Sequence, residues 1–206
     1  QIYLQPRCYF YKKNEKFDNV NEFIDDDDDD LGDHLKILSW AHSEIESWIS
    51  EQNKDSSIRT IAGGPGSGKS SFAKILAADL AILNKRVLFV PLHQIDLDVG
   101  IAKAISDYFK QSGHFSDDPL SYKSNELTIL ILDGLDEIQM QGRAAQESAQ
   151  SFVNDLIRYI DRINTTSCKI LCLITGRDLA VQSAEGFMKN ESQVLYLAPY
   201  SIPRKE

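Results

Sequence analysis

The sequence has no long apolar segment and few cysteines, and each shortage excludes a class of protein. No apolar run approaches the roughly 20 residues that a membrane-spanning helix needs, and the best candidate, residues 129–132, fits a buried strand. The N-terminus has no basic stretch followed by an apolar one, so no signal peptide is predicted. The 3 cysteines are an odd number and, without a secretory signal, indicate reduced thiols in a cytoplasmic protein.

Basic residues are also in short supply. Lys and Arg number 22 against 31 Asp and Glu, which gives a net charge of −9. A nucleic-acid-binding face needs clustered Lys and Arg, so the composition argues against such a face. A short basic groove is still compatible with this composition. Residues 25–30 are all Asp, and we expect a solvated loop there because like charges repel. A Ca²⁺ site or a site for a basic partner is the alternative for this acidic run, but the Gly and Glu of a Ca²⁺ loop are missing.

What is present is a chain long enough for one sizeable domain. Its 206 residues are 42% hydrophobic and 26% charged, which is ordinary for a globular protein. The first residue is not Met, so we expect a piece of a longer protein. Residues 1–32 are predicted to be an N-terminal lead-in that contains the acidic run, and residues 33–206 are predicted to form the domain. Asp33 is placed to cap a helix that continues to about Gln52, because apolar residues recur there at helical intervals.

From residue 58 onward, apolar strands alternate with helices. Such crossover connections build a parallel sheet, and nearly continuous apolar strands indicate helices on both of its faces. The predicted fold is therefore a three-layer α/β/α sandwich. The five predicted strands are 58–62, 86–92, 127–132, 169–174 and 193–197. The predicted helices are 69–83, 98–109, 146–163 and 179–189, and a loop is expected over 111–126.

A glycine-rich loop follows the strand 58–62 and opens the helix 69–83. It fits G-x-x-x-x-G-K-[ST] at every position, in the strand–loop–helix context that this phosphate-binding motif requires. Glycines let backbone N–H groups turn toward phosphate oxygens, and the helix N-terminus adds partial positive charge. Lys69 would contact the β- and γ-phosphates, and Ser70 would ligate Mg²⁺. The predicted nucleotide-binding residues are Gly63, Gly64, Pro65, Gly66, Ser67, Gly68, Lys69, Ser70 and Ser71.

A second motif is an apolar strand that ends in carboxylates, LTILILDGLDE over residues 127–137. Asp133, at the end of the strand, is placed to hold Mg²⁺ directly or through water. Asp136 and Glu137 follow on the turn, where they could polarise an attacking water. The three carboxylates would repel one another without a cation, which supports a metal nearby. The alternative is an acidic surface turn after a strand.

A third motif, LCLITGR over residues 171–177, is again a strand that ends in polar residues. The carboxyl ends of parallel strands are where α/β sheets bind ligands. Arg177 could contact a γ-phosphate and so respond to its presence, and Thr175 could orient water. A surface salt bridge is the alternative for Arg177. Taken with the second motif, the candidate catalytic residues are Asp136, Glu137 and Arg177.

The segments GGPGSGKSS, LTILILDGLDE and LCLITGR resemble the NACHT-type NTPases of the STAND class of signalling ATPases. The resemblance covers about residues 33–200. Many P-loop families share the glycine-rich loop, so the form Asp-Gly-Leu-Asp-Glu is what narrows the choice of family. It implies a P-loop NTPase fold with a five-stranded parallel sheet in the order 5-1-4-3-2. It also implies phosphate and Mg²⁺ binding by Lys69, Ser70 and Asp133, hydrolysis by Asp136 and Glu137, and a sensor role for Arg177.

The resemblance implies a cytoplasmic, slowly hydrolysing ATPase switch. ATP with Mg²⁺ would favour self-association of the full-length protein, and conversion to ADP would reset it, in signalling or in innate or antiphage defence. NACHT proteins continue into helical and winged-helix regions, and we expect these and the effector and sensor domains to lie outside this chain. The trigger, the output and the preference for ATP over other triphosphates stay open.

Two other classes of enzyme stay open. A motor-type AAA+ ATPase would remodel protein or nucleic acid, but it normally has adjacent Asp and Glu at the strand end, whereas Gly134 and Leu135 intervene here. A small-molecule kinase is disfavoured because the paired Asp136 and Glu137 suit activation of water. The sequence has no signature of an acceptor site that could exclude a kinase. A GTPase is disfavoured because the base-reading motif Asn-Lys-x-Asp is missing.

Overall fold

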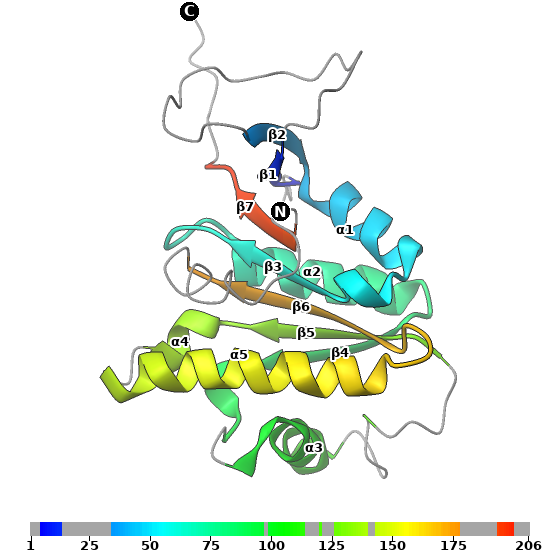
Figure 1. Cartoon of the computed structure of the whole chain (residues 1–206), viewed down its shortest axis with the longest axis vertical. Coiled ribbons are helices and arrows are strands. Elements are labelled where there is room, and N and C mark those ends of the chain that lie inside the picture. Colours follow the sequence, from blue (N-terminus) through cyan, green and yellow to red (C-terminus); the bar gives the residue numbers. More distant parts are fainter. Residues whose placement is uncertain are drawn as a thin grey trace, which may run out of the picture.

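The computed structural model describes residues 5–13, 34–96, 99–113, 120, 126–139, 143–177 and 193–199, arranged around a seven-stranded sheet (Figure 1). Its strands are β1 (Arg7–Lys13), β2 (His34–Trp40), β3 (Ile58–Ala62), β4 (Arg86–Pro91), β5 (Thr128–Asp133), β6 (Ile170–Gly176) and β7 (Val194–Leu197). Its helices are α1 (Ala41–Glu51), α2 (Lys69–Ile82), α3 (Ile101–Gln111), α4 (Leu135–Gln139) and α5 (Arg143–Ile163). Two 3-10 helices, η1 (Lys54–Ser56) and η2 (Leu92–Gln94), complete the described elements.

Five of the strands are parallel and form the sheet that the sequence predicts. Their order is β7-β3-β6-β5-β4, which is the order 5-1-4-3-2 that the resemblance implies. β5 and β6 are buried along their whole length, as expected for strands with helices on both faces. Because all five strands run the same way, their carboxyl ends meet at one edge of the sheet.

Helices cover both faces of the parallel strands, so the fold has three layers (Figure 1). α3 and α5 contribute to one hydrophobic core, which also contains Leu130, Leu132 and Ile174 from the sheet. α1 and α2 contribute to the core on the other face, with Ile131 and Leu173. Successive strand residues point to opposite faces, so β5 and β6 supply side chains to both cores. The predicted α/β/α class is confirmed.

Two antiparallel strands extend the sheet beyond β7, and the sequence analysis missed both. β1 pairs with β7 on one side and with β2 on the other, where its register runs from Arg7 opposite Trp40 to Lys13 opposite His34. The sheet therefore has seven strands rather than five. β2 also occupies the first part of the helix predicted from residue 33, and α1 begins only at Ala41. The apolar spacing over residues 34–40 fits a helix, but pairing with β1 along the whole strand satisfies the backbone groups instead.

Other elements lie close to their predicted ranges, with one addition. Residues 135–139, expected as a turn, form the short helix α4, and α5 begins at residue 143 rather than 146. The predicted helix 179–189, the acidic run 25–30 and most of the loop 111–126 lie outside the described residues. Within the described part of the chain, no helix combines the length and apolar character that crossing a membrane requires.

A buried asparagine fixes the connection between α5 and β6. Asn164 is 3% exposed, and its Oδ1 accepts hydrogen bonds from the backbone N–H groups of Lys169 at 2.9 Å and Ile170 at 3.0 Å. Its Nδ2 donates to the carbonyl oxygen of Ile170 at 2.8 Å. One side chain thus satisfies three backbone groups at the start of the strand that carries Thr175 and leads to Arg177.

Cys8, Cys168 and Cys172 are free thiols. Burial raises the pKa of Cys8 to about 12 and that of Cys168 to about 11, because a thiolate is poorly solvated there. Cys172 is fully buried, and its pKa is raised for the same reason.

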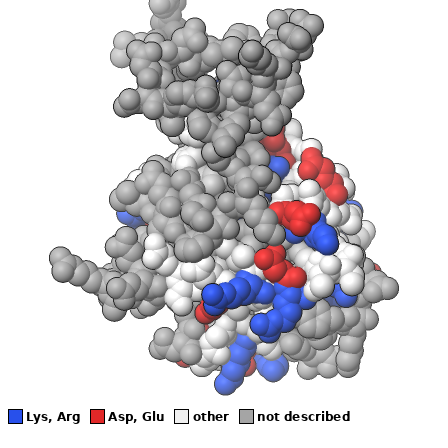
Figure 2. All heavy atoms as spheres, in the orientation of Figure 1, with Lys and Arg blue, Asp and Glu red and all other residues white. Residues whose placement is uncertain are grey.

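The charged side chains are unevenly spread over the surface. Figure 2 shows basic and acidic side chains intermingled on one face, with a group of basic ones in its lower part. The net charge of −9 therefore does not make this face uniformly acidic.

Candidate active site

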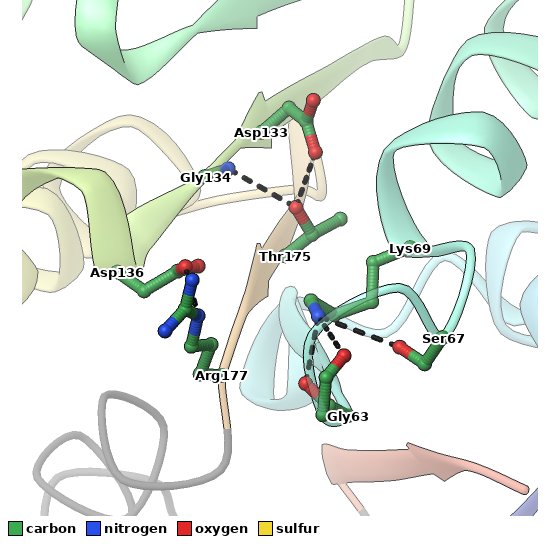
Figure 3. Close-up of polar contacts among 9 residues, drawn as sticks. Gly63, Ser67, Lys69, Asp133, Gly134, Asp136, Thr175 and Arg177 are labelled. Atoms are coloured by element: carbon green, nitrogen blue, oxygen red, sulfur yellow. Dashed lines mark hydrogen bonds and ion pairs between the residues drawn. The ribbon is translucent and has the colours of Figure 1, made fainter. Parts of the chain in front are cut away.

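The three sequence motifs meet at the carboxyl edge of the parallel strands. β6 lies between β3 and β5, with Ala62 opposite Gly176 and Leu132 opposite Ile174. The glycine-rich loop after β3, the carboxylate at the end of β5 and the residue after β6 therefore emerge side by side (Figure 3). The sheet order, rather than proximity in sequence, brings the predicted site together.

The glycine-rich loop curls around the ammonium group of Lys69, the first residue of α2. Lys69 Nζ donates to the carbonyl oxygens of Gly63 at 2.7 Å and Gly64 at 3.0 Å, and to the hydroxyl of Ser67 at 3.4 Å. A Cβ on Gly63 would lie 2.7 Å from Ser67 Oγ, so only glycine allows this close approach. The loop thus gathers backbone groups and a full positive charge at the N-terminus of α2.

The other predicted residues of the glycine-rich loop lie on its outer side. Pro65 and Gly66 form its exposed tip, and Gly68 is the N-cap of α2. Ser70 and Ser71 are exposed in the first turn of the helix. The side chain of Ser70 is therefore accessible from solvent.

Asp133 ends β5 and is only 8% exposed. The hydroxyl of Thr175 in β6 donates to Asp133 Oδ1 at 2.5 Å and accepts from the backbone N–H of Gly134 at 3.1 Å. The same N–H also donates to the carbonyl oxygen of Thr175 at 3.2 Å. Thr175 therefore ties the ends of β5 and β6 together and orients the Asp133 carboxylate (Figure 3).

Asp136 and Glu137 lie in α4, directly after Asp133, and each has a basic partner. Arg177 Nε is 2.8 Å from Asp136 Oδ2, and His93 Nδ1 is 2.7 Å from Glu137 Oε2. The second contact is an ion pair only when the imidazole is protonated. The sequence suggested that a metal relieves repulsion among these carboxylates, whereas these two already have basic neighbours.

Gly134 makes room for the carboxyl group of Glu137. Its φ of 94° lies in the region that side chains rarely adopt. A Cβ at this position would lie 3.0 Å from Glu137 Cδ. The backbone N–H of Glu137 donates to the Gly134 carbonyl oxygen at 3.0 Å, which closes the turn into α4. Glycine is therefore needed here both for the backbone and for the position of the carboxylate.

Arg177, the predicted phosphate sensor, contacts a predicted hydrolytic residue. Its side chain is 46% exposed, whereas that of Asp136 is 17% exposed. The guanidinium reaches Asp136 across the ends of β6 and β5 (Figure 3). In the described conformation Arg177 thus forms an ion pair, as in the alternative given for it above, and its partner is a predicted hydrolytic residue.

His93 is a site residue that the sequence analysis missed. It lies in η2, directly after β4, and Pro91 of β4 is opposite Asp133 of β5. No motif marks it. The rule that identified Asp133, a polar residue just past the carboxyl end of a parallel strand, would also have selected His93.

Residues 60–186 match the model of the family described as "ATPase family associated with various cellular activities (AAA)". The matched span contains the glycine-rich loop, the carboxylates of the second motif and Arg177. The chain belongs to the AAA family of ATPases. A search of curated proteins gave no match.

This AAA domain is also similar to several solved structures. The Aeropyrum pernix ORC2 protein in its ADP form is 18% identical, with a TM-score of 0.49, covering 76% of this chain and 47% of that one. A chain of the E. coli MS115-1 HORMA:CdnC:Trip13 complex is 18% identical, with a TM-score of 0.41 and coverage of 78% and 58%. A chain of Drosophila ORC bound to AT-rich DNA and Cdc6 is 14% identical, with a TM-score of 0.39 and coverage of 78% and 56%. The chain spans about half the length of these structures.

Membership of the AAA family supports nucleoside triphosphatase activity with ATP as ligand and Mg²⁺ as the usual metal. The residues of this AAA domain fit both. Lys69 supplies a positive charge inside a loop of backbone groups, and Asp133 and Ser70 offer the hard oxygen ligands that Mg²⁺ takes beside phosphate. The match identifies the AAA family, and it does not extend to the narrower NACHT class.

Proposed function

We propose that this AAA domain is a slowly hydrolysing ATP switch whose nucleotide state controls self-association of the full-length protein. The observation that carries the proposal is the contact between Arg177 and Asp136, at 2.8 Å. It joins the residue that would detect a γ-phosphate with one that would activate water. A change in nucleotide can therefore alter the sensor and the hydrolytic residue together.

In this proposal the chain holds the nucleotide through the glycine-rich loop. Lys69 and the loop N–H groups would bind the phosphates, and Ser70 and Asp133 would hold Mg²⁺. The bound ion would neutralise part of the phosphate charge. The hydroxyl of Thr175 supports this arrangement, because its bond to Asp133 Oδ1 keeps the carboxylate at the sheet edge.

Asp136 and Glu137 would act on the attacking water, since either carboxylate can accept its proton. In the described conformation each already has an oxygen in contact with a basic side chain. A carboxylate so engaged has to leave or share its partner before it can serve a water. This requirement supports slow basal turnover.

The same contact suggests how ATP and ADP would differ. A γ-phosphate brings negative charge that competes with Asp136 for Arg177, whereas ADP has no such group. A ligand shifts a conformational equilibrium only through unequal affinity for the two states. Movement of Arg177 from Asp136 to the phosphate would supply that inequality, and it would release Asp136.

Replacement of Arg177 tests the switch. Arg177→Ala should bind ADP like the parent and lose about 10- to 100-fold of its preference for ATP, as expected for one charge-assisted contact. Calorimetry with ADP and a non-hydrolysable ATP analogue, each with Mg²⁺, measures both affinities. Arg158→Ala is the matched control, because Arg158 is 78% exposed and pairs with Asp155 on the surface at 3.8 Å. An unchanged ATP/ADP affinity ratio in Arg177→Ala would remove the residue from the switch.

A test of the link between nucleotide state and self-association requires the full-length protein. Light scattering should give a larger mass with the ATP analogue than with ADP, and Arg177→Ala should abolish that difference. The NACHT resemblance, through its three motifs, suggests that such a switch works in signalling or defence. A mass that is the same with both nucleotides in the parent protein would contradict the proposal.

A remodelling motor is the second candidate, and the AAA match over residues 60–186 favours it. A motor would turn over ATP continuously, and DNA or unfolded protein would stimulate it. A switch would show slow turnover that neither addition changes. Phosphate release measured with and without single-stranded DNA and an unfolded protein separates the two candidates.

A further inference from the structure

The contact between His93 and Glu137 sets an imidazole against one of the predicted hydrolytic carboxylates. His93 Nδ1 lies 2.7 Å from Glu137 Oε2. Asp133, by comparison, has a neutral hydroxyl as its partner, and Asp136 has a guanidinium, whose charge is permanent. Imidazole is the side chain that ordinarily changes charge between about pH 5 and 8. Among the described contacts of these three carboxylates, the one with His93 is therefore the one that can respond to pH near neutrality.

Gln94 contacts the other ring nitrogen of His93, with its Nε2 3.2 Å from His93 Nε2. An amide nitrogen only donates, so the neutral imidazole accepts at Nε2 and carries its proton on Nδ1. The charged imidazole carries a proton on both nitrogens, and the Gln94 amide would then turn its oxygen toward Nε2. In both states the Nδ1–H group donates to Glu137. Protonation therefore changes the charge of the donor and leaves the contact in place.

The carboxyl group of Glu137 is also confined by Gly134. A Cβ on Gly134 would lie 3.0 Å from Glu137 Cδ and 3.1 Å and 3.3 Å from its two oxygens. The carboxyl group thus folds back over the turn that begins α4, with Oε2 directed to His93. To accept a proton from an attacking water, the carboxylate has to leave or share that donor. A firmer hold by His93 would therefore slow hydrolysis.

The surroundings of His93 leave Glu137 as the charge that the described contacts set against the ring. α4 packs against η2, and its charged residues are Asp136 and Glu137. Asp136 is engaged by a guanidinium, and Asp133, at the end of β5, by a hydroxyl of β6. Asp96 follows η2 on the same segment as His93. The side chains of His93 and Glu137 are 53% and 43% exposed, so protons from solvent reach the ring, and solvent screening keeps the effect modest.

We propose that His93 is a positioning residue for Glu137 and that its charge makes ATP hydrolysis depend on pH. The charged imidazole holds the carboxylate firmly over Gly134, and the neutral imidazole gives it up more readily to the attacking water. Hydrolysis therefore becomes faster as the pH rises through the range in which imidazole loses its proton. The inference rests on the proposed function, because Glu137 must act on the water for its release to matter.

The test measures kcat and KM for ATP with Mg²⁺ in the full-length protein, from about pH 6 to about pH 8.5, which spans the ordinary titration of imidazole. The ratio of variant to parent kcat at each pH cancels the titrations that both proteins share. His93→Ala should exceed the parent kcat by about 2- to 5-fold at the acidic end, the range expected for an exposed ion pair. Its ratio should fall toward 1 at the alkaline end, and KM should stay at the parent value, because the glycine-rich loop holds the phosphates.

Two further variants separate charge from contact. His93→Asn keeps a neutral donor and should exceed the parent kcat at the acidic end and match it at the alkaline end. His93→Arg keeps a permanent charge and should match the parent at the acidic end and be slower at the alkaline end. His42→Gln is the matched control, because His42 Nε2 lies 3.5 Å from Glu46 in α1. It removes an imidazole that is beside a carboxylate but does not contact Glu137, so its ratio to the parent should be the same at every pH.

Each outcome decides the inference. A kcat ratio for His93→Ala that does not change with pH would overturn it, because the residue would then have only a structural role. A His93→Arg protein as fast as the parent at the alkaline end would also overturn it. If His93→Ala does not fold by circular dichroism, His93→Asn and His93→Arg keep a polar side chain at this exposed position and decide the question. A parent protein that does not hydrolyse ATP, or whose rate Glu137→Gln leaves unchanged, would overturn the proposed function itself, and this inference with it.

Discussion

At the scale of single residues, the described site joins acidic and basic side chains in pairs. Asp136 is with Arg177 and Glu137 is with His93, while Asp133 is held by the hydroxyl of Thr175. Asp133, which would hold the metal, therefore has a different kind of partner from Asp136 and Glu137, which would act on water. Binding and hydrolysis should respond to different substitutions.

We predict that Glu137→Gln and Asp136→Asn keep ATP bound and slow its hydrolysis. Loss of a general base typically reduces the rate by about 10²- to 10⁴-fold, whereas the phosphates would still be held by the glycine-rich loop. Phosphate release in the full-length protein, with affinity measured in parallel, checks both parts. Asp155→Asn on the exposed face of α5 is the control. Parent rates in both site variants would show that neither carboxylate activates the water.

The residues that the sequence identified are those whose neighbours along the chain define a motif. Lys69 closes a glycine-rich loop, and Asp133 ends an apolar strand, so local spacing is enough to find them. His93 contacts Glu137 from the end of another strand, and no local spacing marks it. Its position follows only from the order and register of the sheet.

At the scale of elements, burial decides which strands the sequence reveals. β5 and β6 are buried on both faces and read as continuous apolar runs. β2 is an edge strand that keeps Leu38 48% exposed and Trp40 46% exposed. The apolar residues of β2 therefore do not mark one buried face of a strand, and their spacing also fits a helix. Only the pairing with β1, distant in sequence, determines that it is a strand.

The junction of α5 and β6 should be a sensitive point for stability. Asn164→Ala removes three hydrogen bonds and leaves the N–H of the partly buried Lys169, and both backbone groups of the buried Ile170, without this partner. We predict a loss of about 2–4 kcal/mol in the free energy of unfolding, because unsatisfied buried polar groups are costly. Urea denaturation followed by circular dichroism measures it.

Asn53→Ala is the matched control for this prediction. Asn53 is exposed, and its side chain accepts one hydrogen bond, from the N–H of Asp55 at 2.9 Å. Its loss should cost about 0.5–1 kcal/mol, as for an ordinary cap residue. Similar losses in the two variants would show that the contacts of Asn164 do not stabilise the start of β6.

At the scale of the whole molecule, ligand binding should raise stability, because a ligand that binds only the folded chain favours that chain by mass action. ATP with Mg²⁺ at a concentration about 100 times its Kd would add about 2.7 kcal/mol. For a chain of 206 residues, that corresponds to a rise in Tm of about 5–10 °C.

We predict that Lys69→Ala abolishes this rise in Tm at the same ATP concentration. Loss of the ammonium group would leave phosphate charge uncompensated and cost about 2–4 kcal/mol of binding. Differential scanning fluorimetry with and without ATP and Mg²⁺ measures the effect. Lys74→Ala, an exposed position of the same helix, should keep the parent shift. An undiminished shift in Lys69→Ala would contradict nucleotide binding at the glycine-rich loop.

Strand β7, with the ribbon formed by β1 and β2 beside it, limits how small this domain can be made. The family match, residues 60–186, contains all three motifs but omits both strands of the ribbon and β7. A fragment trimmed to that range would lose the partner that β3 has in β7 at residues 60–62. A strand from the middle of the sheet would become an open edge, and such edges recruit other chains. A piece that contains all three motifs would thus still expose a strand edge, so trimming should be guided by strand pairing rather than by sequence motifs.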